Sequence, residues 1–149
     1  MRTLFQRDTV ITIVGRIYHL TPYKQRLWGK MNVDQMLAHC SVAMQTAIGD
    51  KFFKSNLIFK IIGPIFKSQT TNDKQFKMNS PTNPNFVINS TEGFEKEQQN
   101  LIKLIYQFRD GGEEKCTKNP HSFFGKLTAT QWSSLMYKHL NNHLTQFGV

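Results

Sequence analysis

The chain has 149 residues, a length that suits one domain with a single hydrophobic core. Hydrophobic residues make up 39% of it, which excludes a disordered protein, and two cysteines are too few for a disulfide scaffold. The net charge of +9 comes from lysines and arginines scattered in ones and twos, so it favours a solvated basic surface over a nucleic-acid interface. No apolar run is long enough to act as a signal peptide or to cross a bilayer, so we expect a cytoplasmic protein with no transmembrane segment.

Two amphipathic helices are predicted in the first third of the chain. Apolar side chains recur every three or four positions over residues 7–19, and Pro22 ends the pattern. The second helix is predicted to begin after Asn32, because Asn32 and Gln35 form the pattern of a capping box. Gly49 supplies a typical helix stop.

Residues 50–90 carry no clear period. The segment Lys51–Lys67 is dense in Phe, Ile and Leu and is broken by a Gly-Pro pair, so we expect a helical or irregular arm that packs on the bundle and shields its own apolar residues. Residues 69–85 are polar and contain prolines, which predicts a long loop. A loop of this length in a small domain is typically a lid or a crossover connection.

A third helix is predicted over Ser90–Arg109. Asn89 and Glu92 form a second capping-box pattern ahead of its apolar stripe, and Gly111–Gly112 are expected to end it. The last helix is the most regular one in the chain. It is predicted to begin after Thr128, again with a glutamine three residues later, and its apolar stripe continues without a gap to the end of the chain.

Four amphipathic helices without any strand pattern predict an all-α fold. We expect a four-helix bundle with a long crossover connection between helices 2 and 3, forming a single domain over residues 1–149. The residues predicted for its core are Trp132, Leu135, Phe94, Leu101, Met36 and Leu37.

The candidate chemistry of the chain lies in its histidines. His139 and His143 are four residues apart, so they share one face of the last helix and can bind one divalent ion. The alternative is a pair of histidines at the core edge, bonded to backbone or water. His39 lies at the edge of the second helix's apolar stripe, and bundles build metal sites from facing helices. The sequence therefore predicts a three-His site with one open position, for which zinc, nickel, iron or copper are all suitable.

The two cysteines and the remaining two histidines are weaker candidates for a chemical role. Cys40 is expected to be a small core residue and Cys116 to have no role, while His19 is expected at the surface or at a helix cap. His121 is expected to pack within a loop, with a place beside or on the metal as the alternative. Residues 128–149 contain no Asp or Glu, so no carboxylate base is predicted beside the paired histidines.

The chain resembles the DinB superfamily of metal-dependent enzymes and, within it, a bacterial subfamily of unknown function. The resemblance rests on the stretches WGKMNVDQMLAHC at 28–40, NSPTNP at 79–84 and HSFFGKLTATQWSSLMYKHLNNHLTQFG at 121–148, of which the last is the most specific. It implies a four-helix bundle with a long crossover after the second helix. It also implies a metal site formed by His39, His139 and His143.

Members of that superfamily include transferases and isomerases that use small thiols, which favours a metal-dependent enzyme here. Asn142 stands where many members carry another His, but this position points away from the site. A thiol-dependent transferase or a hydrolase of small molecules is the leading hypothesis, and a non-catalytic metal-binding or small-molecule-binding bundle is the alternative. The expected partner is a small thiol or anionic substrate, and a homodimer remains one option for the assembly.

Overall fold

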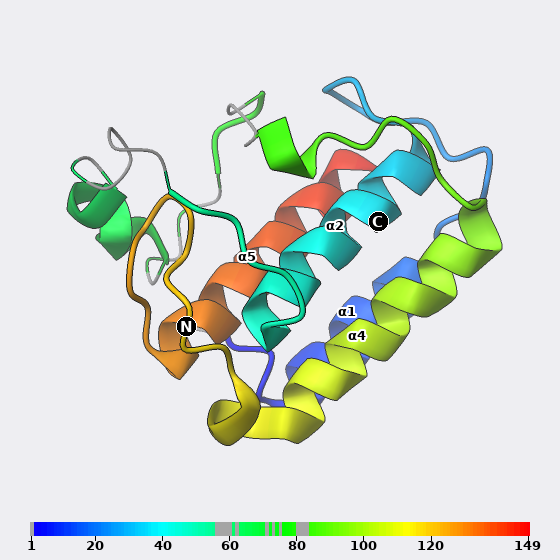
Figure 1. The fold of residues 1–149 in the computed structure, drawn as a ribbon. Coiled ribbons are helices and arrows are strands. Elements are labelled where there is room, and N and C mark those ends of the chain that lie inside the picture. The colour runs from blue at the N-terminus through cyan, green and yellow to red at the C-terminus, as the bar shows by residue number, and fades with distance from the viewer. Residues whose placement is uncertain are drawn as a thin grey trace.

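The computed structural model describes residues 2–55, 61, 63–70, 72, 74, 76–79 and 84–149. Over these residues the fold is all-helical and contains no strand, which confirms the predicted fold class (Figure 1). None of the helices described is both long and apolar enough to cross a membrane. The α-helices are α1 (Arg7–Tyr18), α2 (Val33–Ile48), α4 (Phe94–Lys115) and α5 (Ala129–Gln146).

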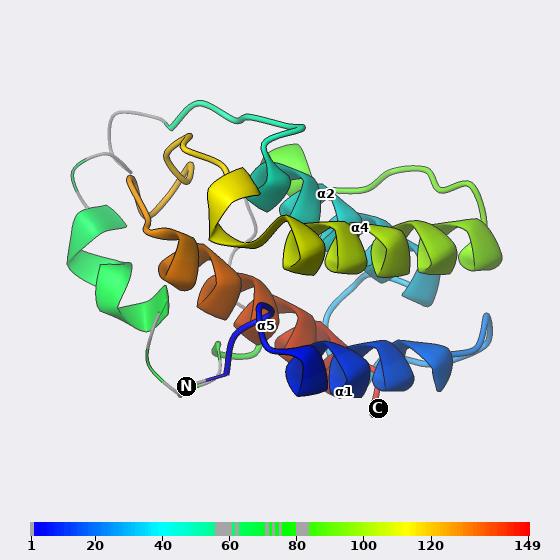
Figure 2. The same cartoon turned by 90° about the horizontal axis from the view of Figure 1, so that it is seen from below.

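The four helices form two layers around one core. Figure 2 shows α2 beside α4 in one layer and α5 beside α1 in the other. Because α2 also packs on α5 and α1 also packs on α4, each helix has two neighbours, as in a four-helix bundle. All six residues predicted for the core are buried, namely Trp132, Leu135, Phe94, Leu101, Met36 and Leu37.

Two helices begin where their capping boxes predict. The Asn32 side chain accepts the backbone N–H of Gln35, whose own side chain accepts the N–H of Asn32. Thr128 and Gln131 make the same reciprocal pair ahead of α5. Each box satisfies two backbone N–H groups that have no partner inside the helix, so it fixes the register of the helix that follows.

The predicted start of the third helix is wrong by four residues. Gly93, with a φ of 99°, precedes the first helical residue, and the expected Asn89–Glu92 box does not form. The backbone N–H of Glu92 is instead accepted by the Glu97 side chain at 3.1 Å. At the other end the helix is interrupted at Gly112, whose φ of 59° is not helical, as the prediction for Gly111–Gly112 had it, and a short further helical stretch continues to Lys115.

The crossover between α2 and α4 lies across one side of the bundle (Figure 1). Its described residues form two 3₁₀ helices, η1 (Gly63–Thr70), which packs on α5, and η2 (Pro84–Phe86), which packs on α2. The predicted arm therefore contacts the bundle, but it does not shield all its apolar side chains, since Ile61 is 68% and Ile65 74% exposed. The parts of this prediction that concern residues 56–60 and 62, and residues 80–83 of the NSPTNP stretch, fall outside the described residues.

Candidate metal centre

Three histidine side chains meet between α2 and α5. His39, in the first half of α2, faces His139 and His143, in the second half of α5, because the two helices pack together in opposite directions (Figure 1). One ring nitrogen from each residue lies within 4.8 Å of the other two. The predicted convergence of the three rings is confirmed, and this group of atoms is able to hold a metal ion.

The rings of His39 and His143 are each oriented by an oxygen atom. His39 Nδ1 lies 3.0 Å from the backbone oxygen of Phe86, and His143 Nδ1 lies 2.8 Å from Gln146 Oε1. A carbonyl oxygen only accepts, so both Nδ1 atoms carry the proton and both Nε2 atoms keep a lone pair. Such outer hydrogen bonds fix the ring orientation of metal-ligating histidines.

Gln146 is itself held in place from the other side. Its Nε2 donates to the backbone oxygen of Trp28 at 2.7 Å, and its backbone oxygen accepts the N–H of Leu27 at 2.7 Å. The side chain is almost fully buried, and a Cβ atom on Gly29 would lie only 2.3 Å from its Nε2. The loop before α2 therefore packs around Gln146 too closely for a larger residue at position 29.

His139 differs from the other two rings. Its Nε2 lies 2.9 Å from His39 Nε2, and its Nδ1 is buried without a hydrogen-bond partner among the described residues. Since His39 Nε2 holds a lone pair, the proton between these two atoms belongs to His139 Nε2. To present a lone pair to an ion, His139 must move this proton to Nδ1, so it is the ring whose state changes on metal binding.

The spacing of the nitrogens fits a small divalent ion. Zinc–nitrogen bonds of about 2.0–2.1 Å in a tetrahedron place ligand nitrogens about 3.3 Å apart. The observed nitrogen–nitrogen distances are compatible with this value, since His39 Nε2 and His139 Nε2 are 2.9 Å apart and all three nitrogens lie within 4.8 Å of one another. The ring centroids are 4.6–4.9 Å apart, so the three rings are nearly equidistant from one another.

Burial keeps all three imidazoles neutral. It lowers the pKa of His39 and lowers the pKa of His143 to about 4, against an ordinary value near 6.5. For His139, burial and the neighbouring histidines together hold the pKa well below that value. None of the described carboxylates acts on these pKa values, so the site offers neutral nitrogen ligands and no acidic group beside them.

Cys40, His19 and His121 lie where the sequence predicted, and Cys116, for which no position was predicted, is buried. Cys40 is buried in the core, Cys116 is buried with its thiol near the backbone oxygen of Ala47, and burial raises both thiol pKa values. His19 is exposed at the end of α1. His121 packs within its loop, since its Nδ1 accepts two backbone N–H groups.

Two supporting groups were not predicted from the sequence. Gln146 is three residues after His143, a spacing that places the two side chains side by side on a helix, so its role had a local signal. The Phe86 carbonyl had none. It reaches His39 only because η2 of the crossover packs against α2, a contact between residues 47 positions apart.

Comparison with known proteins gives one match. A family model described as "Protein of unknown function (DUF1569)" matches residues 6–148, which is nearly the whole chain. None of the curated proteins and none of the solved structures matches the chain significantly. The comparisons therefore supply a family but no reaction.

Proposed function

Because the chain belongs to the DUF1569 family, whose function is unknown, we propose a function from its site: a divalent-metal-dependent enzyme that acts on small molecules. One observation carries the proposal, the meeting of three neutral histidine nitrogens within 4.8 Å between two helices. Two of these rings are already fixed in the tautomer that a metal ligand needs. Buried unpaired polar atoms are costly, and a metal would use the lone pairs that converge here.

Three histidine ligands leave one coordination position free for substrate, as in catalytic zinc sites. A bound divalent ion supplies a Lewis acid that lowers the pKa of a thiol or water in that position. His39, His139 and His143 would hold that ion, while the Phe86 carbonyl and Gln146 orient two of the three rings. No described carboxylate acts on the cluster, which favours transfer of a thiol, whose deprotonation needs no separate base, over hydrolysis.

We also propose that the family is related to the DinB superfamily. Support comes from the sequence stretches at 28–40 and 121–148 and from the positions of the three histidines on the second and the last long helix. The long crossover between α2 and α4 is a further point of similarity. Under this relationship a thiol-dependent transferase is the first activity to test.

The missing carboxylate also supports a second candidate, a bundle that binds metal without catalysis. Both candidates need the metal, so the first experiment is elemental analysis of protein purified without a histidine tag. We expect about one divalent ion per chain in the wild type and none in the variant with all three histidines changed to alanine. The variant His19→Ala, which removes an exposed histidine, is the control and should keep the ion.

Equal metal content in the wild type and the triple variant would refute both candidates. If only the wild type carries the ion, a panel of thiols with electrophilic acceptors separates them. Metal-dependent turnover that is lost in the triple variant identifies the enzyme, and its absence across the panel favours the binding bundle.

A further inference from the structure

Three segments meet at the end of the bundle where α2 ends and α5 begins. They are the irregular stretch after α2 (residues 51–54), Ile61 together with η1, and the loop before α5 (residues 118–126). Figures 1 and 2 both show η1 outside the four-helix bundle at this end, beside the start of α5. We call the surface that these segments form the lysine-rich face.

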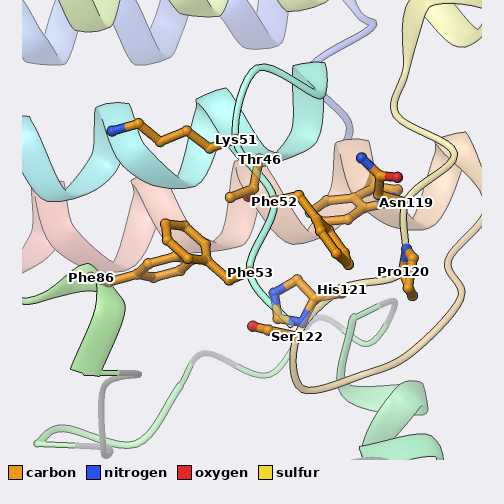
Figure 3. A pocket seen from close by; sticks show the side chains of 10 residues that line it. Thr46, Lys51, Phe52, Phe53, Phe86, Asn119, Pro120, His121 and Ser122 are labelled. Atoms are coloured by element: carbon orange, nitrogen blue, oxygen red, sulfur yellow. The ribbon is translucent and has the colours of Figure 1, made fainter. Parts of the chain in front are cut away.

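Close contacts hold the three segments together. In η1 the backbone of Gly63 packs against the backbone oxygen of Phe123 with no room for a side chain, and the ring centroids of Phe66 and Phe123 are 6.3 Å apart. Phe52 and Asn119 line one small hollow, so the stretch after α2 lies against the loop before α5 (Figure 3). Residues that are far apart in the sequence therefore form one surface.

Large apolar side chains project from the lysine-rich face into solvent. Ile61 is 68% and Ile65 74% exposed, while Phe52 is 48% and Phe66 39% exposed. Single exposed apolar residues are ordinary on a protein surface, whereas a group of them rimmed by polar residues marks a site that meets a partner or a membrane. Whatever covers this face must therefore offer an apolar region.

The charge of the lysine-rich face is positive. Residues 51–72 and 116–127 contain six lysines and no aspartate, glutamate or arginine, so they contribute six of the nine net positive charges of the chain. The exposed lysines among the described residues of these ranges are Lys51, Lys54, Lys118 and Lys126. Lysines that are scattered along the sequence are thus gathered at one end of the fold.

We propose that the lysine-rich face binds the surface of an anionic membrane. The exposed isoleucine and phenylalanine side chains enter the boundary between headgroups and acyl chains. The lysines have long apolar stems, so they keep their ammonium groups at the level of the anionic headgroups. This combination of apolar side chains and lysines is what such a boundary requires.

A nucleic acid fits the lysine-rich face less well. The exposed isoleucines would find no apolar partner along a phosphate backbone, and protein sites that recognise phosphates favour arginine, which both ranges lack. The membrane inference does not depend on the proposed metal site, because it uses none of the three clustered histidines.

The test is sedimentation of the full chain with large phosphatidylcholine vesicles, with and without about 30% phosphatidylserine. We expect binding to the anionic vesicles alone, and a partition coefficient that falls about tenfold or more when salt rises from about 50 to about 500 mM. The variant Ile61→Ser with Ile65→Ser should bind about tenfold more weakly or less, because two apolar side chains no longer leave water.

Two control variants change exposed residues away from this face. Ile11→Ser with Leu27→Ser replaces side chains that are 52% and 69% exposed on α1 and in the loop before α2, and should bind like the wild type. Lys118→Gln should weaken binding about fivefold, whereas Lys103→Gln, which removes an exposed lysine from α4, should change it less than about twofold. Circular dichroism checks that every variant is folded.

No binding to the anionic vesicles at low salt would overturn the proposal, and so would equal losses in the two double variants. Two further measurements identify a different occupant. Binding to a DNA duplex that needs Lys118 but not Ile61 and Ile65 would assign the face to nucleic acid. A dimer in sedimentation velocity that Ile61→Ser with Ile65→Ser abolishes would assign it to a second copy of the chain. Either result without vesicle binding would overturn the membrane assignment.

Discussion

The α2–α5 contact contains two kinds of buried histidine. At one end His39, His139 and His143 direct nitrogens toward a common point, within 4.8 Å of one another. At the other end, His121 Nδ1 accepts hydrogen bonds from two backbone N–H groups of its own loop. Burial lowers the pKa of His121 to about 4, the same value that it gives His143.

The comparison shows that burial and a low pKa do not by themselves make a ligand. Both environments keep the imidazole neutral at pH 7. They differ in where the lone pair points, which is decided by the partner of the other nitrogen. In His143 an oxygen accepts the Nδ1 proton, so the Nε2 lone pair is free for a metal. In His121 the Nδ1 lone pair accepts backbone N–H groups, so Nε2 carries the proton and cannot bind a metal.

The largest expected effect is on metal affinity after removal of one histidine from each environment. Loss of an outer partner of a metal ligand costs about 10–100-fold, so loss of a ligand in His143→Ala should weaken zinc binding by more than about 100-fold. His121→Asn keeps an acceptor for the loop N–H groups and should leave zinc affinity within about threefold. Competition with a chromophoric chelator measures both, and similar losses in the two variants would contradict the distinction.

A second effect concerns acid stability, where the two environments should act alike. The pKa values of His121 and His143 are lower in the folded protein than in the unfolded chain, so protonation favours unfolding. Stability should be full above pH 6.5 and fall as the pH drops toward about 4, by about 2 kcal/mol per histidine at pH 5. Urea unfolding of metal-free protein at pH 7, 6 and 5 measures this loss.

The exposed His19 provides the control for that series, because His19→Ala should leave the pH dependence unchanged. A constant unfolding free energy from pH 7 to pH 5 would show that the buried imidazoles are not neutral. Metal affinity should follow the lowered pKa values as well. It should persist below pH 6.5, the ordinary histidine range, and fall only as the pH approaches about 4.

A smaller effect is expected from the outer partner of His143. Gln146→Leu removes the acceptor of His143 Nδ1–H and should weaken zinc binding about 10–100-fold. The matched control is Gln98→Leu, which removes a side-chain hydrogen bond to the Ile17 backbone between α4 and α1. If both variants lose metal affinity equally, the loss reflects weaker packing of the bundle and not the orientation of His143.

The bundle was predictable because its signals are local. The capping boxes at Asn32 and Thr128 mark helix starts within four residues of sequence, and the spacing of His139 and His143 fixes their common face. His39 needed one further step, the facing of two helices, which its place at the edge of an apolar stripe made reasonable. The confirmed convergence of the three rings follows from these three signals.

The crossover was less predictable because its contacts are not local. Its apolar density suggested complete burial, yet Ile61 and Ile65 stay exposed. The carbonyl of Phe86 reaches His39 from a distant part of the chain, and a backbone atom leaves no pattern in the sequence. Gly93 precedes α4 and has no side chain that could cap the helix. A capping-box pattern therefore cannot predict this helix start.

The most direct test of the metal centre is an anomalous difference map from crystals of the zinc-loaded protein. The proposed site predicts one zinc peak about 2.0–2.1 Å from a ring nitrogen of each of His39, His139 and His143. The Nδ1 atoms of His39 and His143 should keep their bonds to Phe86 and Gln146. A zinc peak elsewhere, with the His39 and His139 rings still hydrogen-bonded to each other, would contradict the central claim.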